Sequence, residues 1–290
     1  MAYESLEEIC RFCEAEAVPF WRAVLLDDMN ERSASESTSI DTMRNMWQAM
    51  LDASNAYDET LTSQSGLVGG MGGQMEAWRR KGNTLCGDFV SEVIAQALQM
   101  GESNACMKRI VAAPTAGACG VLPAVLVPLY RENRAEEKQI IQALYTAAGI
   151  GQVIAARAFI AGASGGCQAE IGAAASMAAG ALVSIRGGDC GQIIQAAAMA
   201  LKNLLGLVCD PVAGLVEIPC VKRNVIGAMS ALSAADMALA GITSRIPPDQ
   251  VIDAMREVGE AIHVSLRETG EGGVANTPSG KEIAARLMIK

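Results

Sequence analysis

Apolar residues recur at spacings of three and four along much of the chain, which is the period of one face of an α-helix. This pattern predicts an amphipathic helix over residues 4–28 and a second helix over residues 40–51. The polar segment 33–39 between them has the composition of a linker that ends in helix-capping residues. Residues 1–60 are therefore expected to form a helical cover on a second unit, residues 61–290, which carries the chemistry.

Further along, several segments are apolar nearly all round, as in helices at the centre of a bundle. Residues 136–163 and 170–185 have this character, and helices over 192–206 and 223–243 are expected to follow. A last amphipathic helix is predicted for residues 249–263. No alternating strand pattern with hairpin turns occurs, so we expect an all-α fold, a compact bundle of mostly buried, Ala/Gly-rich helices with glycine-rich loops.

Composition narrows the possible functions. Of the 290 residues, 51% are apolar and only 4% are aromatic, which favours close-packed helices with small contact residues. A net charge of −9 argues against a nucleic-acid partner. The long apolar runs contain charged residues and are short for a bilayer, so buried helices are expected and membrane spans are not. The start of the chain lacks the features of a signal peptide, and its nine cysteines are interpreted as reduced thiols of a cytoplasmic protein, not disulfides.

Two glycine-rich segments are candidates for binding a small anion. Five of residues 66–75 are glycine, no nucleotide-binding motif is present, and Ser63 and Ser65 lie just before them. Backbone amides in such a loop can approach an anion closely, although a flexible connection has the same composition. The second segment begins at Thr115, a predicted N-cap before the small residues 116–120. That helix start could hold a carboxylate, or it could be a plain capped helix.

Three cysteines lie among glycines or beside prolines, where helices stop and the chain turns: Cys167, Cys209 and Cys220. Three thiolates without a nearby histidine fit zinc or an iron–sulfur cluster, and their spacing does not separate the two. Three buried apolar cysteines are the alternative. Cys190 is interpreted as an incidental cysteine in a surface turn, and Cys10 and Cys13 as core residues one helical turn apart.

The single histidine, His263, is expected at a structural or surface position, which removes Ser–His and Cys–His nucleophile schemes. No lysine lies in an obvious Schiff-base motif. The glycine-rich C-terminal segment could fold back over the active site.

Several stretches, in the same order along the chain, resemble the alpha chain of the bacterial iron–sulfur L-serine dehydratases. The resemblance runs from about residue 60 to about residue 282. The stretches that carry it are SQSGLVGG (63–70), AAPTAGACGVLPAVL (112–126), GCQAE around Cys167, LKNLLGLVCDPVAGLVEIPCVKRN around Cys209 and Cys220, AADMALAGITSRIP (234–247) and LRETGEGGVANTPSG (266–280).

The resemblance implies a [4Fe–4S] cluster held by the three cysteines, with one iron left without a protein ligand. That iron would act as a Lewis acid on the hydroxyl and carboxylate of L-serine, which is converted to pyruvate and ammonia. It also implies a separate beta chain, so that the complete enzyme is a hetero-oligomer and its active site is expected to lie at an interface. A related lyase acting on L-cysteine or L-threonine, or a non-catalytic metal-binding subunit, remains an alternative.

The residues expected to contact the substrate come from the two glycine-rich segments. They are Ser63, Ser65, Gly66, Thr115 and Gly117. The base that removes the α-proton is not evident from the sequence. Lys222 and Glu170 are the candidates, because they are the titratable residues nearest to the cysteines in sequence.

Overall fold

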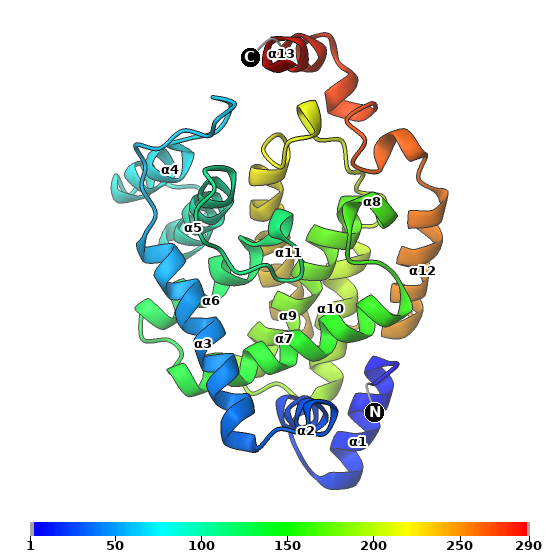
Figure 1. Ribbon diagram of the computed structural model, residues 1–290. Helices are drawn as coiled ribbons and strands as arrows, with labels where there is room; N and C mark the ends of the chain where they lie inside the picture. The colour runs from blue at the N-terminus through cyan, green and yellow to red at the C-terminus, as the bar shows by residue number, and fades with distance from the viewer. Residues whose placement is uncertain (1–2, 289–290) are drawn as a thin grey trace.

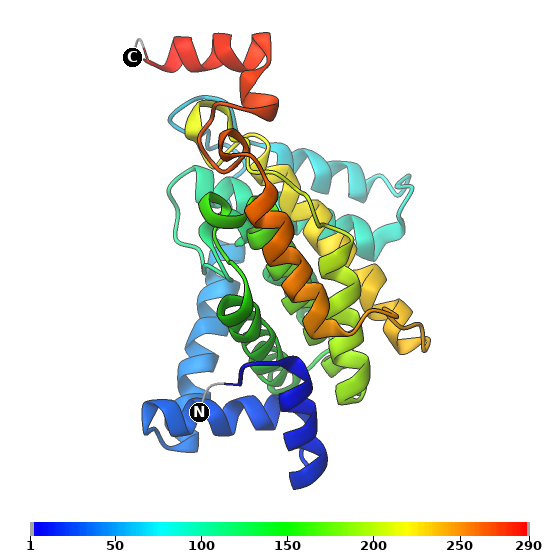
Figure 2. The same cartoon turned by 90° about the vertical axis from the view of Figure 1, so that its right-hand side faces the viewer.

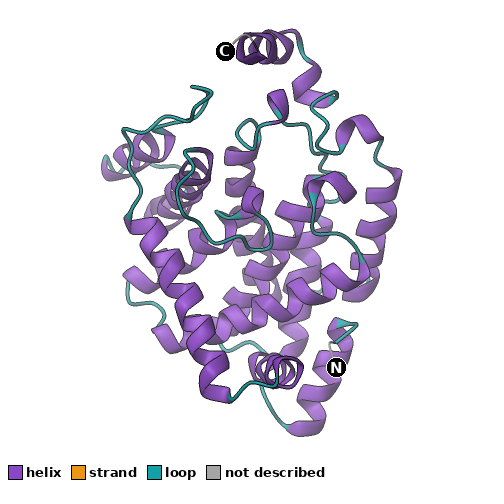
Figure 3. Ribbon diagram, in the orientation of Figure 1, coloured by secondary structure: helices purple, strands orange, loops and turns teal. Residues whose placement is uncertain are grey.

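The computed structural model describes residues 3–288, and within this range the chain is all-α, as predicted. Thirteen α-helices are joined by short turns of other helical types, and Figure 3 shows no strand among the described residues. The single β-type feature in this range is an isolated bridge between Cys209 and Arg267.

Helix α9 (Ala173–Ile185) lies at the centre of the bundle (Figure 1), and all of its residues except Ser184 are buried. Its small side chains let neighbouring helices approach closely. A Cβ atom added at Gly180 would lie 2.2 Å from Cδ1 of Ile150, so no larger residue fits there without a shift. The helices packed around it are α6 (Val121–Arg131), α7 (Glu137–Arg157), α10 (Cys190–Lys202) and α11 (Cys220–Leu239).

The single helix predicted for residues 4–28 is wrong, because the structure has two helices there. Helix α1 (Leu6–Glu16) ends at Ala17, whose φ of 52° is left-handed, and α2 (Phe20–Arg32) begins after Pro19. Proline disfavours helical geometry in the residue before it, so the backbone leaves the helix here. The helical spacing of apolar residues nevertheless continues across the break. Helix α3 (Glu36–Asn55) begins earlier than predicted and is capped by a serine of the polar linker, as expected.

The remaining helices lie around the outside of the central bundle. Helices α4 (Met71–Arg80) and α5 (Gly87–Ala105) are separated by a turn, and α12 (Pro248–Ala261) runs along the side of the bundle. The C-terminal segment also contains a helix that the sequence did not predict, α13 (Pro278–Met288). Figures 1 and 2 place α13 at the end opposite α1 and α2, beyond the short helix α8 (Gly162–Gly165).

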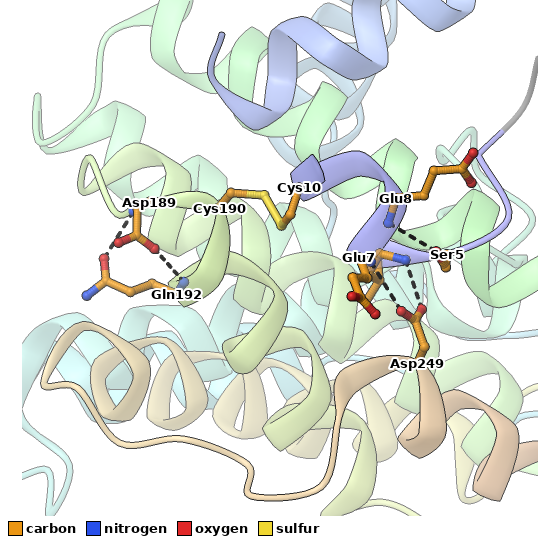
Figure 4. Close-up of a disulfide and its surroundings, with 9 residues drawn as sticks. Ser5, Glu7, Glu8, Cys10, Asp189, Cys190, Gln192 and Asp249 are labelled. Carbon is orange, nitrogen blue, oxygen red and sulfur yellow. Dashed lines mark hydrogen bonds between the residues drawn. A yellow bond between two sulfur atoms is a disulfide. The ribbon is translucent and has the colours of Figure 1, made fainter. Parts of the chain in front are cut away.

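A disulfide between Cys10 and Cys190 joins α1 to α10 (Figure 4). The expectation that all nine cysteines are reduced is therefore wrong for this pair. The interpretation of Cys190 as incidental is wrong too, and so is that of Cys10 as a plain core residue. The two residues are 180 positions apart, and local sequence patterns carry no information on contacts at that separation. Cys13, one helical turn from Cys10, is buried and free, as expected. The first amides of α1 donate hydrogen bonds to Asp249 of α12, so α1 is held at its start as well as through Cys10.

Two helices are long and apolar enough to cross a membrane by length and composition alone. They are Glu137–Arg157 and Gln168–Ile185, and 61% and 89% of their apolar windows are buried inside the protein. That burial is typical of core helices. Buried side chains of α1, α2 and α3 belong to the same hydrophobic core as those of the central helices.

Candidate metal and substrate site

The three cysteines of interest lie in loops and helix starts at one end of the bundle. Cys167 precedes a π-helical turn (Gln168–Gly172) that leads into α9, Cys209 lies in the loop between α10 and α11, and Cys220 is the first residue of α11. All three are buried, with exposed fractions of 2%, 2% and 8%. The ligand atoms of Cys167, Cys209 and Glu170 lie within 4.8 Å of one another.

The charges in this cluster differ from one cysteine to the next. A hydrogen bond from the Cys209 thiol, opposed by burial and helped by the nearby Arg223, lowers the pKa of Cys167. The same hydrogen bond, together with burial, raises the pKa of Cys209. Burial raises the pKa of Cys220 to about 12, and the negative charge on Cys167 adds to the rise. The three thiols therefore influence one another's pKa, and Cys167 is the one whose pKa is lowered.

Arg223 and Asp210 are site residues that the sequence analysis missed. Nη1 of Arg223 lies 3.3 Å from the sulfur of Cys167, and Nη2 donates to Asp210 at 2.7 Å. The sequence did contain an indication that Arg223 belongs to the site. It follows Cys220 by three residues, and residues at that spacing share one face of a helix. Asp210 follows Cys209 directly.

The C-terminal segment folds back over the cysteine loop, as the sequence suggested. The amide of Cys209 donates to the carbonyl of Leu266 at 2.8 Å, and the amide of Glu268 donates to the carbonyl of Cys209 at 2.8 Å. The amide of Val274 donates to the second oxygen of Asp210 at 2.7 Å. Residues 266–274 are therefore part of the site.

The second glycine-rich segment reaches the cysteines through Glu170. Thr115 occupies the N-cap position of the following helix, as predicted, but its hydroxyl donates to Oε1 of Glu170 at 2.7 Å and makes no capping hydrogen bond. That helix is only a 3₁₀ turn (Ala116–Ala118), too short for the helix-start carboxylate site that we expected. Burial raises the pKa of Glu170. The hydrogen bond from Thr115 partly offsets this rise, and the negative charge of Glu268 adds to it.

Two glycines allow the backbone to approach the side chains of Cys209 and Glu170 closely. A Cβ atom added at Gly162 would lie 2.9 Å both from the sulfur of Cys209 and from Oε2 of Glu170. One added at Gly117 would lie 3.2 Å from Oε1 of Glu170. The carbonyl of Gly117 also accepts a hydrogen bond from Asn224 at 2.9 Å, which ties this segment to α11.

The first glycine-rich segment is anchored to the loop between Cys209 and Cys220. The hydroxyl of Ser63 donates to Oε2 of Glu217 at 3.0 Å, and Ser65 donates to the same oxygen. Gly66 follows in a left-handed turn with φ of 77°. Glu217 is buried and was not singled out from the sequence.

The two candidate bases lie in different surroundings. Glu170 adjoins two cysteine sulfurs, whereas Lys222 is exposed and lines a groove with Met71, Met75 and Trp78. His263 is exposed after the end of α12, where its Nδ1 bonds with Ser265, in agreement with the surface position expected for it.

Buried sulfur donors, one of them with a lowered pKa, suit a soft metal ion or an iron–sulfur cluster. A carboxylate of raised pKa beside them suits proton transfer. The arrangement therefore has the parts for metal-assisted acid–base chemistry on a small anionic substrate.

Comparison with known proteins agrees with this arrangement. The family model described as "Serine dehydratase alpha chain" matches residues 15–275. The "Probable L-serine dehydratase, alpha chain" of Bacillus subtilis (strain 168) is 46% identical over 273 residues, covering 92% of this chain and 91% of the relative. The "L-serine dehydratase, alpha chain" of Peptoniphilus asaccharolyticus is 39% identical over 281 residues, covering 95% of each chain. The "L-serine dehydratase TdcG" of Escherichia coli (strain K12) is 35% identical over 284 residues, covering 94% of this chain and 61% of the relative.

Proposed function

Because the chain belongs to the family of serine dehydratase alpha chains, it is a lyase acting on L-serine, and we propose that it does so with a [4Fe–4S] cluster. The products are pyruvate and ammonia, formed when loss of water from serine leaves an enamine that tautomerises and hydrolyses. The observation that carries the proposal is the meeting of buried cysteines, one of them with a lowered pKa, with a carboxylate of raised pKa.

We assign the cluster to Cys167, Cys209 and Cys220. What supports the assignment is that all three are buried and that the charge on Cys167 acts on both of the others. Cys119 is also buried, but its sulfur faces the carbonyl of Met100 inside the helical core. Three sulfur ligands leave one iron of a four-iron cluster without a protein ligand, and when bound the cluster supplies Lewis-acid chemistry.

Glu170 is the residue that we propose as acceptor of the α-proton. Its raised pKa makes it a stronger base than an exposed carboxylate, and Thr115 fixes one of its oxygens. Lys222, the other candidate, is exposed on the groove side of α11. A hydrogen bond from Thr115 orients Glu170, which is a different role from the direct substrate contact expected of that hydroxyl.

The substrate carboxylate remains assigned to the two glycine-rich segments. Gly66 and Gly117 can offer backbone amides, and Ser63 and Ser65 can offer hydroxyls. In the structure the hydroxyls of Ser63 and Ser65 donate to Glu217, so to bind L-serine they would have to give up these hydrogen bonds for bonds to the substrate.

We also propose that a separate beta chain completes the enzyme. Two of the relatives above carry the words "alpha chain" in their names, and the Escherichia coli relative extends well beyond the part that this chain matches. Residues 61–290 would hold the chemistry and residues 1–60 would cover the bundle. The cytoplasm is the proposed location.

The test is anaerobic purification followed by iron and acid-labile sulfide analysis and an assay of pyruvate from L-serine. Single Cys→Ser changes at the three ligands should abolish iron content and activity. Cys119→Ser is the matched control, since it alters a buried cysteine outside the site and should retain both. A colourless protein that holds stoichiometric zinc and forms no pyruvate would contradict the proposal and favour a metal-binding subunit.

The same assay decides the substrate. Sulfide released from L-cysteine faster than pyruvate forms from L-serine would indicate a related lyase, as would preferred conversion of L-threonine. Because an isolated alpha chain would lack groups from its partner, the assay is run with and without the candidate beta chain.

A further inference from the structure

Arg223 contacts parts of the site that are far apart in sequence. Its Nη1 donates to the sulfur of Cys167 at 3.3 Å and to the carbonyl of Val208 at 2.7 Å. Its Nη2 donates to Asp210 at 2.7 Å. Since Arg223 itself lies in the first turn of α11 with Cys220, one guanidinium group connects the three segments that carry the cysteines.

The ion pair of Arg223 with Asp210 is more buried than the other arginine–carboxylate pairs described for residues 3–288, of which Arg79 with Glu92 comes nearest, with exposed fractions of 20% and 18%. The exposed fractions of the Arg223 and Asp210 side chains are 14% and 4%, whereas those of the Arg157–Asp253 pair are 26% and 34%. Burying two charges is costly unless their remaining hydrogen-bonding atoms are also satisfied. Here they are, because the second oxygen of Asp210 accepts from the amide of Val274.

The contact with Cys167 distinguishes Arg223 from a purely structural arginine. Pairing with Asp210 alone would neutralise the guanidinium, yet Nη1 also donates to the sulfur of Cys167. Arginine presents its donors in a rigid planar fork, so it can hold a sulfur, a carbonyl and a carboxylate at fixed angles to one another. A lysine carries the same charge but offers only one nitrogen atom.

We propose that Arg223 is a positioning residue for the metal site, which fixes the Cys167, Cys209 and Cys220 segments relative to one another and places a positive charge and an N–H donor beside the cluster. Asp210 orients Arg223 and joins it to the C-terminal segment. The proposal rests on the proposed function, because it assumes that the cysteines hold a cluster.

Loss of Arg223 should weaken retention of the cluster. Residues that orient metal ligands typically change metal affinity by about 10–100-fold when they are replaced. We expect Arg223→Gln to release iron to a chelator faster by about that factor. The reduction potential of the cluster in this variant should shift to a more negative value, since the lost positive charge and hydrogen bond to sulfur both favour the reduced cluster. Arg223→Lys keeps the charge, so its potential should stay close to that of the wild type while its iron release is intermediate.

The matched control is Arg157→Gln, which breaks a partly buried arginine–aspartate pair between α7 and α12. Iron release and potential should not change in this variant, even if its stability falls. Asp210→Asn tests the link in another way, because it removes the partner and leaves the arginine charge in place. Its iron release should be faster than in the wild type, with a smaller shift in potential than in Arg223→Gln.

The outcomes separate the two proposals. Wild-type protein without iron and sulfide would overturn both the proposed function and this inference. A loaded wild type with Arg223→Gln and Arg157→Gln behaving alike would overturn only the inference. Circular dichroism and thermal unfolding identify a variant that fails to fold. If Arg223→Gln does fail, Arg223→Lys and Asp210→Asn still decide, because wild-type iron release in both would overturn the role of Arg223.

Discussion

The Cys10–Cys190 disulfide should contribute strongly to stability while having no part in catalysis. It closes a segment of 180 residues, and the chain-entropy model assigns a loop of that length about 5 kcal/mol of stabilisation. Native disulfides more often contribute about 2–4 kcal/mol. For a chain of this size each kcal/mol shifts the melting temperature by about 2–4 °C, so loss of the disulfide should lower it by about 5–15 °C.

The measurement is thermal unfolding of the wild type with and without a thiol reductant, beside Cys10→Ser and Cys190→Ser. Cys13→Ser is the matched control, because Cys13 is buried one helical turn away and forms no disulfide. Reductant should lower the melting temperature of the wild type to that of the two disulfide variants and leave those variants unchanged. Iron content should be the same in all of them before heating.

Two results would refute this reasoning. If reductant leaves the melting temperature of the wild type unchanged and mass spectrometry finds free thiols at Cys10 and Cys190, the bond does not form in solution. If Cys13→Ser destabilises the protein as much as Cys10→Ser does, packing of α1 and not the covalent link accounts for the effect.

Four further predictions concern the site. Gly162→Ala places a Cβ atom 2.9 Å from the sulfur of Cys209, so we expect reduced iron content by metal analysis; wild-type content would contradict the close packing. Glu170→Gln should lower kcat by about 10²–10⁴-fold with an unchanged cluster spectrum, and wild-type kcat would exclude it as the base. Glu217→Gln weakens the anchor of Ser63, so the KM for L-serine should change by about 2–100-fold at constant iron content, and an unchanged KM would separate that loop from the substrate. Aerobic dialysis with a chelator should remove iron and activity, and ferrous iron with thiol should restore both; full activity after dialysis would argue against an open iron.

Local sequence patterns predicted most of the fold because helices depend on residues close in sequence. The all-α class followed from the periodicity of the apolar residues. The break at Pro19 was missed because the apolar pattern continues across it. Helix α13 was missed because glycines before it make the whole segment resemble a loop.

The site was harder to predict because its contacts join distant parts of the chain. The cysteines and Glu170 were candidates from their local surroundings and from the family resemblance. Arg223 was not, although it lies close to Cys220, because its partners Cys167 and Asp210 are known only once the chain is folded. Glu217 was missed for the same reason, since its bonds reach back to Ser63 and Ser65.

The pairing of residues 266–274 with Cys209 and Asp210 has a consequence for biosynthesis. A growing chain folds its N-terminal parts first. The central bundle can therefore form on the ribosome, while the segment that closes over the cysteine loop is still unmade. The loop that carries Cys209 and Asp210 therefore stays without this covering segment until the last part of the chain has been made.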